Sequence, residues 1–225
     1  MKHSLNLQIK QIKQYIREEY FLYVIMFVGD IMNQYFDNNE KLDSEIKEFF
    51  VQVKDINMYL YTDNGVFNKK GLDFGTRVLL ENLDTNDKDS FLDVGCGCGP
   101  IGFFLLLSGK ENVDMVDVNN RAINLTKMGL KKNHIKANVY NSDIYSNVSG
   151  KFDMIITNPP IHAGKSKIYE IVRESINHLN EDGELWLVIR KDQGANSLIK
   201  DNSDILNFEI IDKIKGFWIL KGLKK

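Results

Sequence analysis

The residues with the clearest chemical potential stand at positions 158–161, where an asparagine is followed by two prolines and an isoleucine. They end an apolar run, residues 152–157, which predicts a buried strand. Two adjacent prolines make a stiff turn and donate no N–H, so nearby carbonyl oxygens can stay unclaimed. The side-chain oxygen of Asn158 and the carbonyl oxygen of Pro159 then make a pair of acceptors for an NH2 group. The segment predicts chemistry on a planar amine, with Asn158, Pro159 and Pro160 as the catalytic residues.

A glycine-rich loop upstream predicts the binding site of a nucleotide-like cofactor. Residues 91–94 read as a short strand, and Gly95, Gly97 and Gly99 follow it at alternate positions. The stretch 97–102 also has the G-x-G-x-x-G pattern of a strand-to-helix turn, which alone is a weak signal. Glycines in such a loop let the backbone pass close beneath a ligand.

Acidic residues at the ends of the predicted strands indicate which ligand the loop holds. Asp93 precedes the first glycine, where a carboxylate would repel a pyrophosphate but suits an ammonium or sulfonium group. Asp117 lies where a carboxylate accepts ribose hydroxyls. Asp143 follows a third strand and can accept from an adenine amine, while Ile144 packs on the ring. Two other roles stay open: Asp93 as an acceptor for loop amides, and Asp143 as a turn residue or helix N-cap.

From residue 90 onward, short apolar runs alternate with helical stretches, which predicts a Rossmann-like α/β fold with a doubly wound, mostly parallel sheet. The expected strands are 91–94, 113–116, 137–140, 154–157 and 185–189, and the expected helices are 101–107, 121–132 and 168–179. Runs at 208–211 and 217–220 predict a closing antiparallel hairpin. Because such sheets bind ligands at the carboxyl ends of their strands, the motifs above should gather at one edge.

The N-terminal part is expected to form a small appendage of a β-hairpin and a helix. Within residues 49–67, apolar residues alternate over 49–53 and again over 56–60, and positions 63–65 supply an Asp-Asn-Gly turn, which predicts two strands and a turn. Residues 73–83 follow as a helix. The first residues are either an amphipathic helix or an extension before a natural start at Met32. The expected boundaries are 1–31 for this extension, 32–84 for the appendage and 85–225 for the main domain.

Composition narrows the class of protein further. The formal net charge of -2 gives no overall attraction to a polyanion, so any contact with nucleic acid must come from a local basic patch. The apolar run at 21–28 is far shorter than the ~20 residues that span a bilayer. Cys96 and Cys98, with one residue between them, suit neither a disulfide framework nor a zinc site. We expect a cytoplasmic protein with no membrane or metal partner.

Taken together, the motifs resemble those of class I S-adenosylmethionine-dependent methyltransferases. The series consists of residues 91–102, Asp117, Asp143 and residues 158–160. More narrowly, the chain resembles the small-domain enzymes that modify the exocyclic N2 of guanine in ribosomal RNA. The segments that carry this narrower likeness are 62–67, 71–76, 117–122 and 161–165. The resemblance covers roughly residues 49–225, and residues 1–31 have no counterpart in it.

The resemblance implies S-adenosyl-L-methionine as the cofactor. Its methionine part would lie along Asp93 and the backbone of Gly95, Gly97 and Gly99. The ribose would bind at Asp117 and the adenine amine at Asp143.

The resemblance also implies RNA as the partner, either ribosomal RNA or a small-subunit particle. The expected substrate contacts are Phe67, Ile161, His162 and Lys165. Ile161 can pack on a base but cannot stack, so Phe67 or His162 would supply an aromatic ring. Lys165 would meet phosphates at the mouth of the site.

Three alternatives stay open. A protein glutamine N5-methyltransferase also fits the acceptor pair, although such enzymes usually carry an aromatic residue at the position of Ile161. A NAD-dependent oxidoreductase would use the same glycine pattern, but Asp93 and the lack of a recognisable hydride-transfer motif disfavour it. A non-catalytic module would bind the cofactor or RNA without transferring a methyl group.

Overall fold

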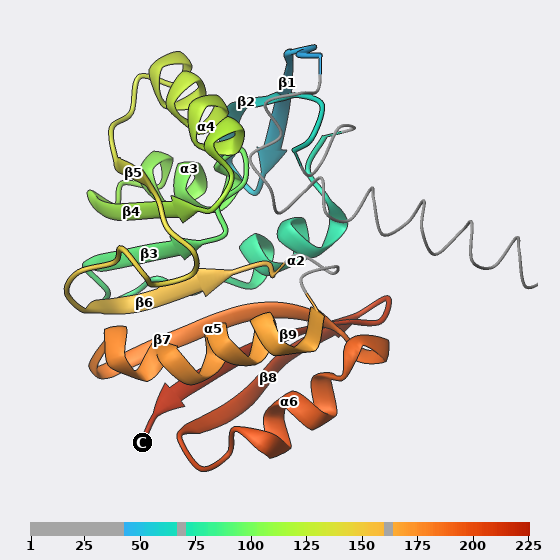
Figure 1. Cartoon of the computed structure of the whole chain (residues 1–225), viewed down its shortest axis with the longest axis vertical. Helices are drawn as coiled ribbons and strands as arrows, with labels where there is room; N and C mark the ends of the chain where they lie inside the picture. The colour runs from blue at the N-terminus through green and yellow to red at the C-terminus, as the bar shows by residue number, and fades with distance from the viewer. Residues whose placement is uncertain (1–42, 67–70, 160–163) are drawn as a thin grey trace, which may run out of the picture.

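The computed structural model describes residues 43–66, 71–159 and 164–225. In this part of the chain the strands form two sheets, one of two strands and one of seven (Figure 1). The expected extension over residues 1–31 lies outside the described residues, as do Phe67 and residues 160–163.

The larger sheet is the doubly wound, mostly parallel sheet that the alternation of strands and helices predicts. Its strand order is β5-β4-β3-β6-β7-β9-β8, and β9 is the one strand of this sheet that runs opposite to the others. The strands are β3 (Ser90–Val94), β4 (Asn112–Asp117), β5 (Asn138–Asn141), β6 (Phe152–Thr157), β7 (Leu179–Arg190), β8 (Leu206–Ile214) and β9 (Phe217–Lys224). The chain runs from β3 outward to β5 and resumes at β6 on the other side of β3. The strand order therefore reverses between β3 and β6, the place where such sheets bind ligands.

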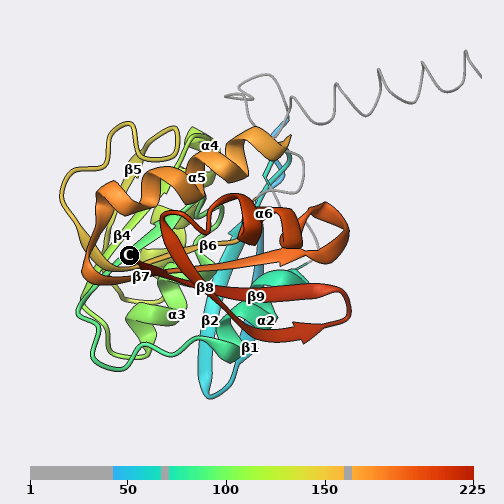
Figure 2. The same ribbon diagram turned by 90° about the horizontal axis from the view of Figure 1, so that it is seen from below.

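Helices cover both faces of this sheet, as Figure 2 shows with α5 and α6 on one side and α2 and α3 on the other. Their bounds are α2 (Phe74–Asn82), α3 (Pro100–Leu107), α4 (Asn120–Lys132), α5 (Gly164–His178) and α6 (Ala195–Asp201). Adjacent residues of β3 face opposite clusters: Phe91 packs with α2 and α3, whereas Leu92 packs with α5 and α6. A strand buried on both faces explains the continuous apolar run in its sequence.

The expected N-terminal hairpin is present as β1 (Lys47–Val53) and β2 (Ile56–Thr62). Its alternate residues Val51, Val53, Met58 and Leu60 are buried in the cluster shared with α2 and α3. The outer edge of β2 is joined to the end of α4 by a side chain. The Asn133 amide accepts from the Tyr59 N–H (2.8 Å) and donates to the Tyr59 carbonyl (2.7 Å), as a neighbouring strand would.

Element ends differ from the expected ones where polar residues continue a strand. Residues 179–190 form one strand, although only 185–189 are apolar enough to predict it. The polar segment before Glu184 bulges away from β6, since the register shifts between the pairs Phe152–Leu179 and Met154–Glu184. Helix α6 and the 3-10 turn η1 (Lys191–Gln193) were not expected. Only Ala195 and Leu198 are buried in α6, too few for a periodic signal.

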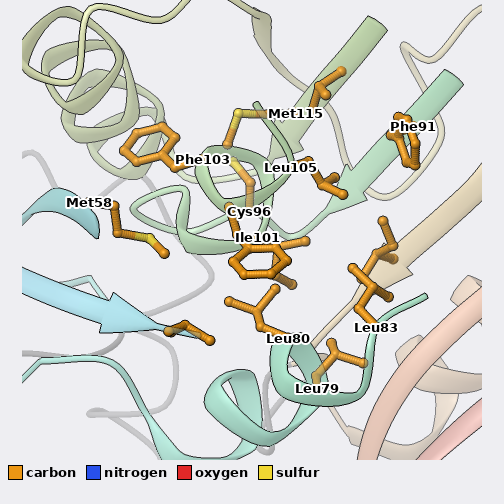
Figure 3. Close-up of a cluster of buried hydrophobic side chains, with 14 of the residues drawn as sticks. Met58, Leu79, Leu80, Leu83, Phe91, Cys96, Ile101, Phe103, Leu105 and Met115 are labelled. Atoms are coloured by element: carbon orange, nitrogen blue, oxygen red, sulfur yellow. The ribbon is translucent and has the colours of Figure 1, made fainter. Parts of the chain in front are cut away.

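A cluster of buried hydrophobic side chains packs beneath the glycine loop, at the carboxyl edge of the sheet. Figure 3 shows Phe103 and Met115 beside Cys96, with Leu80 and Ile101 packed below them. The ring of Phe103 is wholly buried. Its edge atoms lie 2.7 Å and 2.5 Å from where a Cβ would stand at Gly99 and Gly129. This ring therefore occupies the space that two glycines leave open.

Truncation of this ring tests its contribution to stability. Phe103→Ala should lower the free energy of unfolding by about 3–5 kcal/mol, because it leaves a cavity between the loop and α4. Urea denaturation followed by circular dichroism measures the change. Phe50→Ala is the matched control, since that ring is 55% exposed, and it should cost well under half as much. Equal losses for the two variants would contradict the supporting role of Phe103.

Candidate active site

Two of the predicted motifs meet where the sheet reverses its strand order. Asp93 of β3 lies beside Ile156 of β6 in the parallel register. The hydroxyl of Thr157 donates to the carbonyl of Val94 (2.8 Å), which ties the carboxyl ends of the two strands together. The glycine loop after β3 and the Asn-Pro segment after β6 therefore start side by side.

Hydrogen bonds from both sides hold the glycine loop in place. The Gly95 N–H donates to the carbonyl of Val116 at the end of β4 (2.9 Å). The Gly97 N–H donates to the carboxylate of Asp117 (2.8 Å), and its carbonyl accepts from the hydroxyl of Thr126 on α4 (2.7 Å). The loop is thus fixed by its neighbours before any ligand binds.

The loop leaves room above two of its glycines. Gly95 and Gly97 have φ of 72° and 57°, in the left-handed region that favours glycine. No atom of the described residues lies within 4 Å of the position that a Cβ would take at either. Backbone that is pinned below and open above is the arrangement that a flat-lying cofactor needs, so these residues fit S-adenosylmethionine.

Asp93 lies at the base of the loop with its carboxyl group wholly buried. One oxygen accepts from the N–H of Gly102 (3.1 Å), and the other has no hydrogen-bond partner in the described part of the chain. Burial raises the pKa of Asp93 to about 8; the Gly102 bond opposes this shift and the charge of Asp117 adds to it. A buried carboxyl with an unsatisfied oxygen is a site that a cation would stabilise. This position fits the positively charged part of the expected cofactor.

Both carboxylate oxygens of Asp117 already accept hydrogen bonds from backbone N–H groups. One carboxylate oxygen accepts from Gly97 and the other from the Asn119 N–H (2.8 Å each). Burial raises the pKa of Asp117, while these bonds lower it. Each carboxylate oxygen can accept a second hydrogen bond, so ribose binding at Asp117 stays a prediction.

Asp143 and Ile144 lie just after β5, as expected, in a strained turn. Both oxygens of Asp143 accept from Nζ of Lys167 on α5 (3.0 Å each). Ile144 is buried with φ of 51°, a conformation that β-branched residues avoid, and its carbonyl accepts from the hydroxyl of Ser142 (2.9 Å). Asp143 caps no helix in the described residues. Its contact with an adenine amine remains a prediction, and so does the packing of Ile144 on the ring.

The remaining predicted substrate contacts are only partly described. Lys165 stands in the first turn of α5, with its amine 3.9 Å from the carboxylate of Asp201 and over the ring of Tyr169. Its phosphate contact stays a prediction. Pro160, Ile161, His162 and Phe67 lie outside the described residues.

The side chain of Asn158 is held in one orientation by the start of α2. Its Nδ2 donates to the hydroxyl of Thr76 (2.8 Å) and approaches both carboxylate oxygens of Asp73 (3.2 Å each). Asp73 is the N-cap of α2: it accepts from the Thr76 N–H (3.1 Å) and from the Thr76 hydroxyl. Because a carboxylate only accepts, the NH2 end of the amide must face Asp73. The side-chain oxygen of Asn158 therefore points away, and no donor of the described residues contacts it.

Sequence reasoning missed this clamp, which we define as Asp73 and Thr76. Asp73 carried the signal of a helix start, and an acceptor three residues before Thr76 is an ordinary capping pattern. Nothing in that pattern indicates a contact with a residue 85 positions away along the chain. The contact exists because α2 packs against β7 and β9, next to the end of β6.

Both cysteines are buried in the loop and keep their protons at neutral pH. Burial raises the pKa of Cys98 to about 12 and that of Cys96 well above its ordinary value. A protonated thiol is a weak nucleophile, so neither thiol is suited to covalent catalysis.

Membrane-spanning and metal-binding features were both predicted to be absent, and the following holds for residues 43–66, 71–159 and 164–225. No helix in them combines the length and apolar character that a bilayer crossing requires. No three potential metal ligands of the His, Cys, Asp or Glu type come together in them.

Known proteins resemble this chain along most of its length. An uncharacterized protein of Bacillus subtilis, YbxB, is 37% identical over 196 residues, which cover 84% of this chain and 98% of that protein. The ribosomal RNA small subunit methyltransferase C of Haemophilus influenzae is 39% identical over 137 residues, 59% of this chain. The match covers 42% of that enzyme, so this chain corresponds to less than half of its length.

A solved structure shares the fold. The 16S rRNA N2 G1207 methyltransferase of T. thermophilus, in complex with AdoMet and guanosine, superposes with a TM-score of 0.71 at 23% identity. The superposition covers 82% of this chain and 52% of that one.

Residues 57–221 match the family described as methyltransferase small domain. The predicted S-adenosylmethionine-dependent methyltransferase is thereby confirmed, with its cofactor, and the oxidoreductase alternative is wrong. The chain belongs to the methyltransferase small domain family.

Proposed function

We propose that this enzyme transfers the methyl group of S-adenosylmethionine to the exocyclic N2 of a guanine in ribosomal RNA. The observation that carries the proposal is the orientation of Asn158, whose amide nitrogen is bound to the clamp and whose oxygen is left to accept. The relatives named as small-subunit ribosomal RNA methyltransferases support the choice of RNA. We propose the cytoplasm as the place of this reaction.

The two acceptors act by positioning the amine. The lone pair of an exocyclic amine is delocalised into the ring, which makes the nitrogen a poor nucleophile. If Asn158 Oδ1 and the Pro159 carbonyl accept its two hydrogens, the nitrogen becomes more tetrahedral, and its lone pair is less delocalised into the ring and can point at the methyl group of the donor. The bound cofactor supplies a methyl group on a positively charged sulphur. Preorganised dipoles of this kind contribute several kcal/mol to catalysis without a covalent intermediate.

The clamp keeps the acceptor pair intact. Rotating the Asn158 amide by half a turn would break its bond to Thr76 and place its oxygen against the Asp73 carboxylate. That arrangement puts two acceptors face to face and is unfavourable. We also propose that residues 32–84 are an appendage to a catalytic domain over 85–225. In this division the appendage supplies the clamp.

Methylation of ribosomal RNA tests the function directly. The full chain, incubated with total ribosomal RNA and labelled methyl donor, should yield N2-methylguanosine when the digested nucleosides are analysed by mass spectrometry. Asn158→Ala should lower the turnover number about 100-fold or more, while the dissociation constant for S-adenosylmethionine stays nearly unchanged. Label on glutamine of a protein substrate, and none on RNA, would instead support the glutamine N5-methyltransferase. If Asn158→Ala lowered turnover and cofactor affinity equally, Asn158 would not be the acceptor that positions the substrate amine.

The clamp predicts a separate effect on turnover. Thr76→Val keeps the shape of the side chain but removes the hydroxyl that binds Asn158, so kcat should fall about tenfold with KM for RNA little changed. Thr62→Val is the control: Thr62 is also buried, and its hydroxyl has no partner among the described residues. Steady-state kinetics should show no change for this control. A Thr76→Val enzyme with the wild-type kcat would show that the clamp does not position Asn158.

The raised pKa of Asp93 predicts how cofactor affinity depends on pH. Below about pH 8 the free protein holds a proton on Asp93, which must leave before the carboxylate can face a cation. Affinity for S-adenosylmethionine should therefore increase from pH 6 to 8 and level off above that. Calorimetry should show weaker, nearly pH-independent binding for Asp93→Asn. Asp117 is unchanged in this comparison, so the difference reports on Asp93. A flat profile for the wild type would contradict the assignment.

A further inference from the structure

A pocket lies next to Asn158 and Pro159, on the side of β7. Its volume is about 160 Å³, close to the ~150 Å³ of an engineered cavity that admits benzene. A pocket of this size accepts a flat ring and leaves a sugar and phosphate outside. Its walls come from the start of α2, the ends of β6 and β7, and the start of β9.

Two phenylalanines line the pocket from different elements. Phe74 is the first residue of α2 and is 36% exposed, high for such a large apolar ring. Phe217 begins β9, and the two ring centroids are 5.6 Å apart at an interplanar angle of 59°. A Cβ at Gly75 would stand 3.0 Å from the Phe217 ring, so a glycine there allows this close approach. A partly exposed aromatic wall is a surface on which an unpaired RNA base can stack.

One of the residues that line the pocket, Arg190, carries a positive charge. Arg190 ends β7 opposite Phe217, and its guanidinium lies 5.5 Å from the centre of that ring. Asp192 accepts from Nε (3.0 Å) and from Nη2 (2.8 Å), and this pair holds the guanidinium plane. Among the described residues nothing accepts from its Nη1. A guanidinium fixed on one side and open on the other can still donate to a ligand.

We propose that this pocket binds the target base and that Arg190 selects guanine by donating to O6, alone or together with N7. This inference rests on the proposed function, because it places the amine of the base at Asn158. Asn158 and Arg190 line the same small pocket. When the N2 amine of a guanine lies at Asn158, the O6 and N7 acceptors of that guanine lie elsewhere on the base and can face Arg190. Arginine is the usual partner of these two guanine atoms. Adenine carries an NH2 donor in place of O6, and this group would face the guanidinium unfavourably.

Binding of free nucleosides tests base recognition apart from methyl transfer. The full chain, saturated with S-adenosylhomocysteine, is titrated with guanosine, inosine or adenosine by calorimetry. Inosine lacks the amine but keeps O6 and N7, so it reports on Arg190 without being a methyl acceptor. Guanosine and inosine should bind at least tenfold more tightly than adenosine.

Variants connect this preference to the residues of the pocket. Arg190→Lys keeps the charge but loses the planar donor set, and should weaken guanosine and inosine at least tenfold with adenosine and S-adenosylhomocysteine unchanged. Phe74→Leu should weaken all three nucleosides, since stacking does not distinguish bases. The matched control is Arg173→Lys, which changes a partly exposed arginine of α5 that is paired with Asp204 and does not line the pocket. Its binding should equal that of the wild type.

The possible outcomes distinguish a failure of the pocket assignment from a failure of the proposed reaction. Equal binding of inosine and adenosine, no binding of any nucleoside, or an unchanged Arg190→Lys protein would overturn the pocket assignment. If inosine binding depends on Arg190 but ribosomal RNA acquires no N2-methylguanosine, the pocket is correct and the proposed reaction is wrong. If RNA is methylated at guanine N2 while Arg190→Lys retains full discrimination, the reaction is correct and the pocket is wrong.

Discussion

The hydrogen bonds between Asn158 and the start of α2 are the constraint on which the chemistry of this site depends. An asparagine amide has a donor end and an acceptor end of nearly the same shape, and only its surroundings decide which end faces a substrate. Here a carboxylate and a hydroxyl hold the donor end. The oxygen of Asn158 is therefore left without a donor in the described part of the chain and can accept from a ligand. If the Asn158 amide were reversed, its NH2 group would face the amine of the proposed substrate, and two hydrogen-bond donors would meet.

The opposite half of the site depends on burial. Asp93 lies on β3 between β4 and β6, is wholly buried, and its carboxyl has only one hydrogen bond among the described residues. An ionised carboxyl in such a place is costly unless a cation or further donors accompany it. The loop above it is fixed by bonds to β4 and α4 and does not rely on the ligand for its shape. The site thus combines a hydrogen-bonded loop with a buried carboxyl whose pKa is raised to about 8.

These two halves meet because the strand order of the sheet reverses between β3 and β6. The bond from Thr157 to Val94 closes the space between the strands at that point. Helix α2 then contributes from outside the sheet: it packs against β7 and β9 and places Asp73 and Phe74 next to the segment that follows β6. A helix that looks peripheral in the chain is therefore part of the proposed site.

Much of this arrangement was predictable from local patterns. Apolar runs and their spacing predicted the strands and helices that build the sheet, and the glycine and Asn-Pro motifs predicted which loops lie at its carboxyl edge. These predictions succeed because strand burial and turn geometry depend on residues close together in the chain. The ends of β7 and the short helix α6 were missed because their residues are polar or too few to show a period.

The tertiary structure alone decided how Asn158 is oriented, that Asp93 is wholly buried, and that Arg190 lies beside Phe217 and the Asn-Pro segment. Each of these facts depends on contacts between elements far apart in the chain. Such contacts leave no periodic or spacing signal in the sequence, because they are set by how the helices pack on the sheet. The residue types of the site were thus determined by the sequence, and their partners, charge states and orientation by the fold.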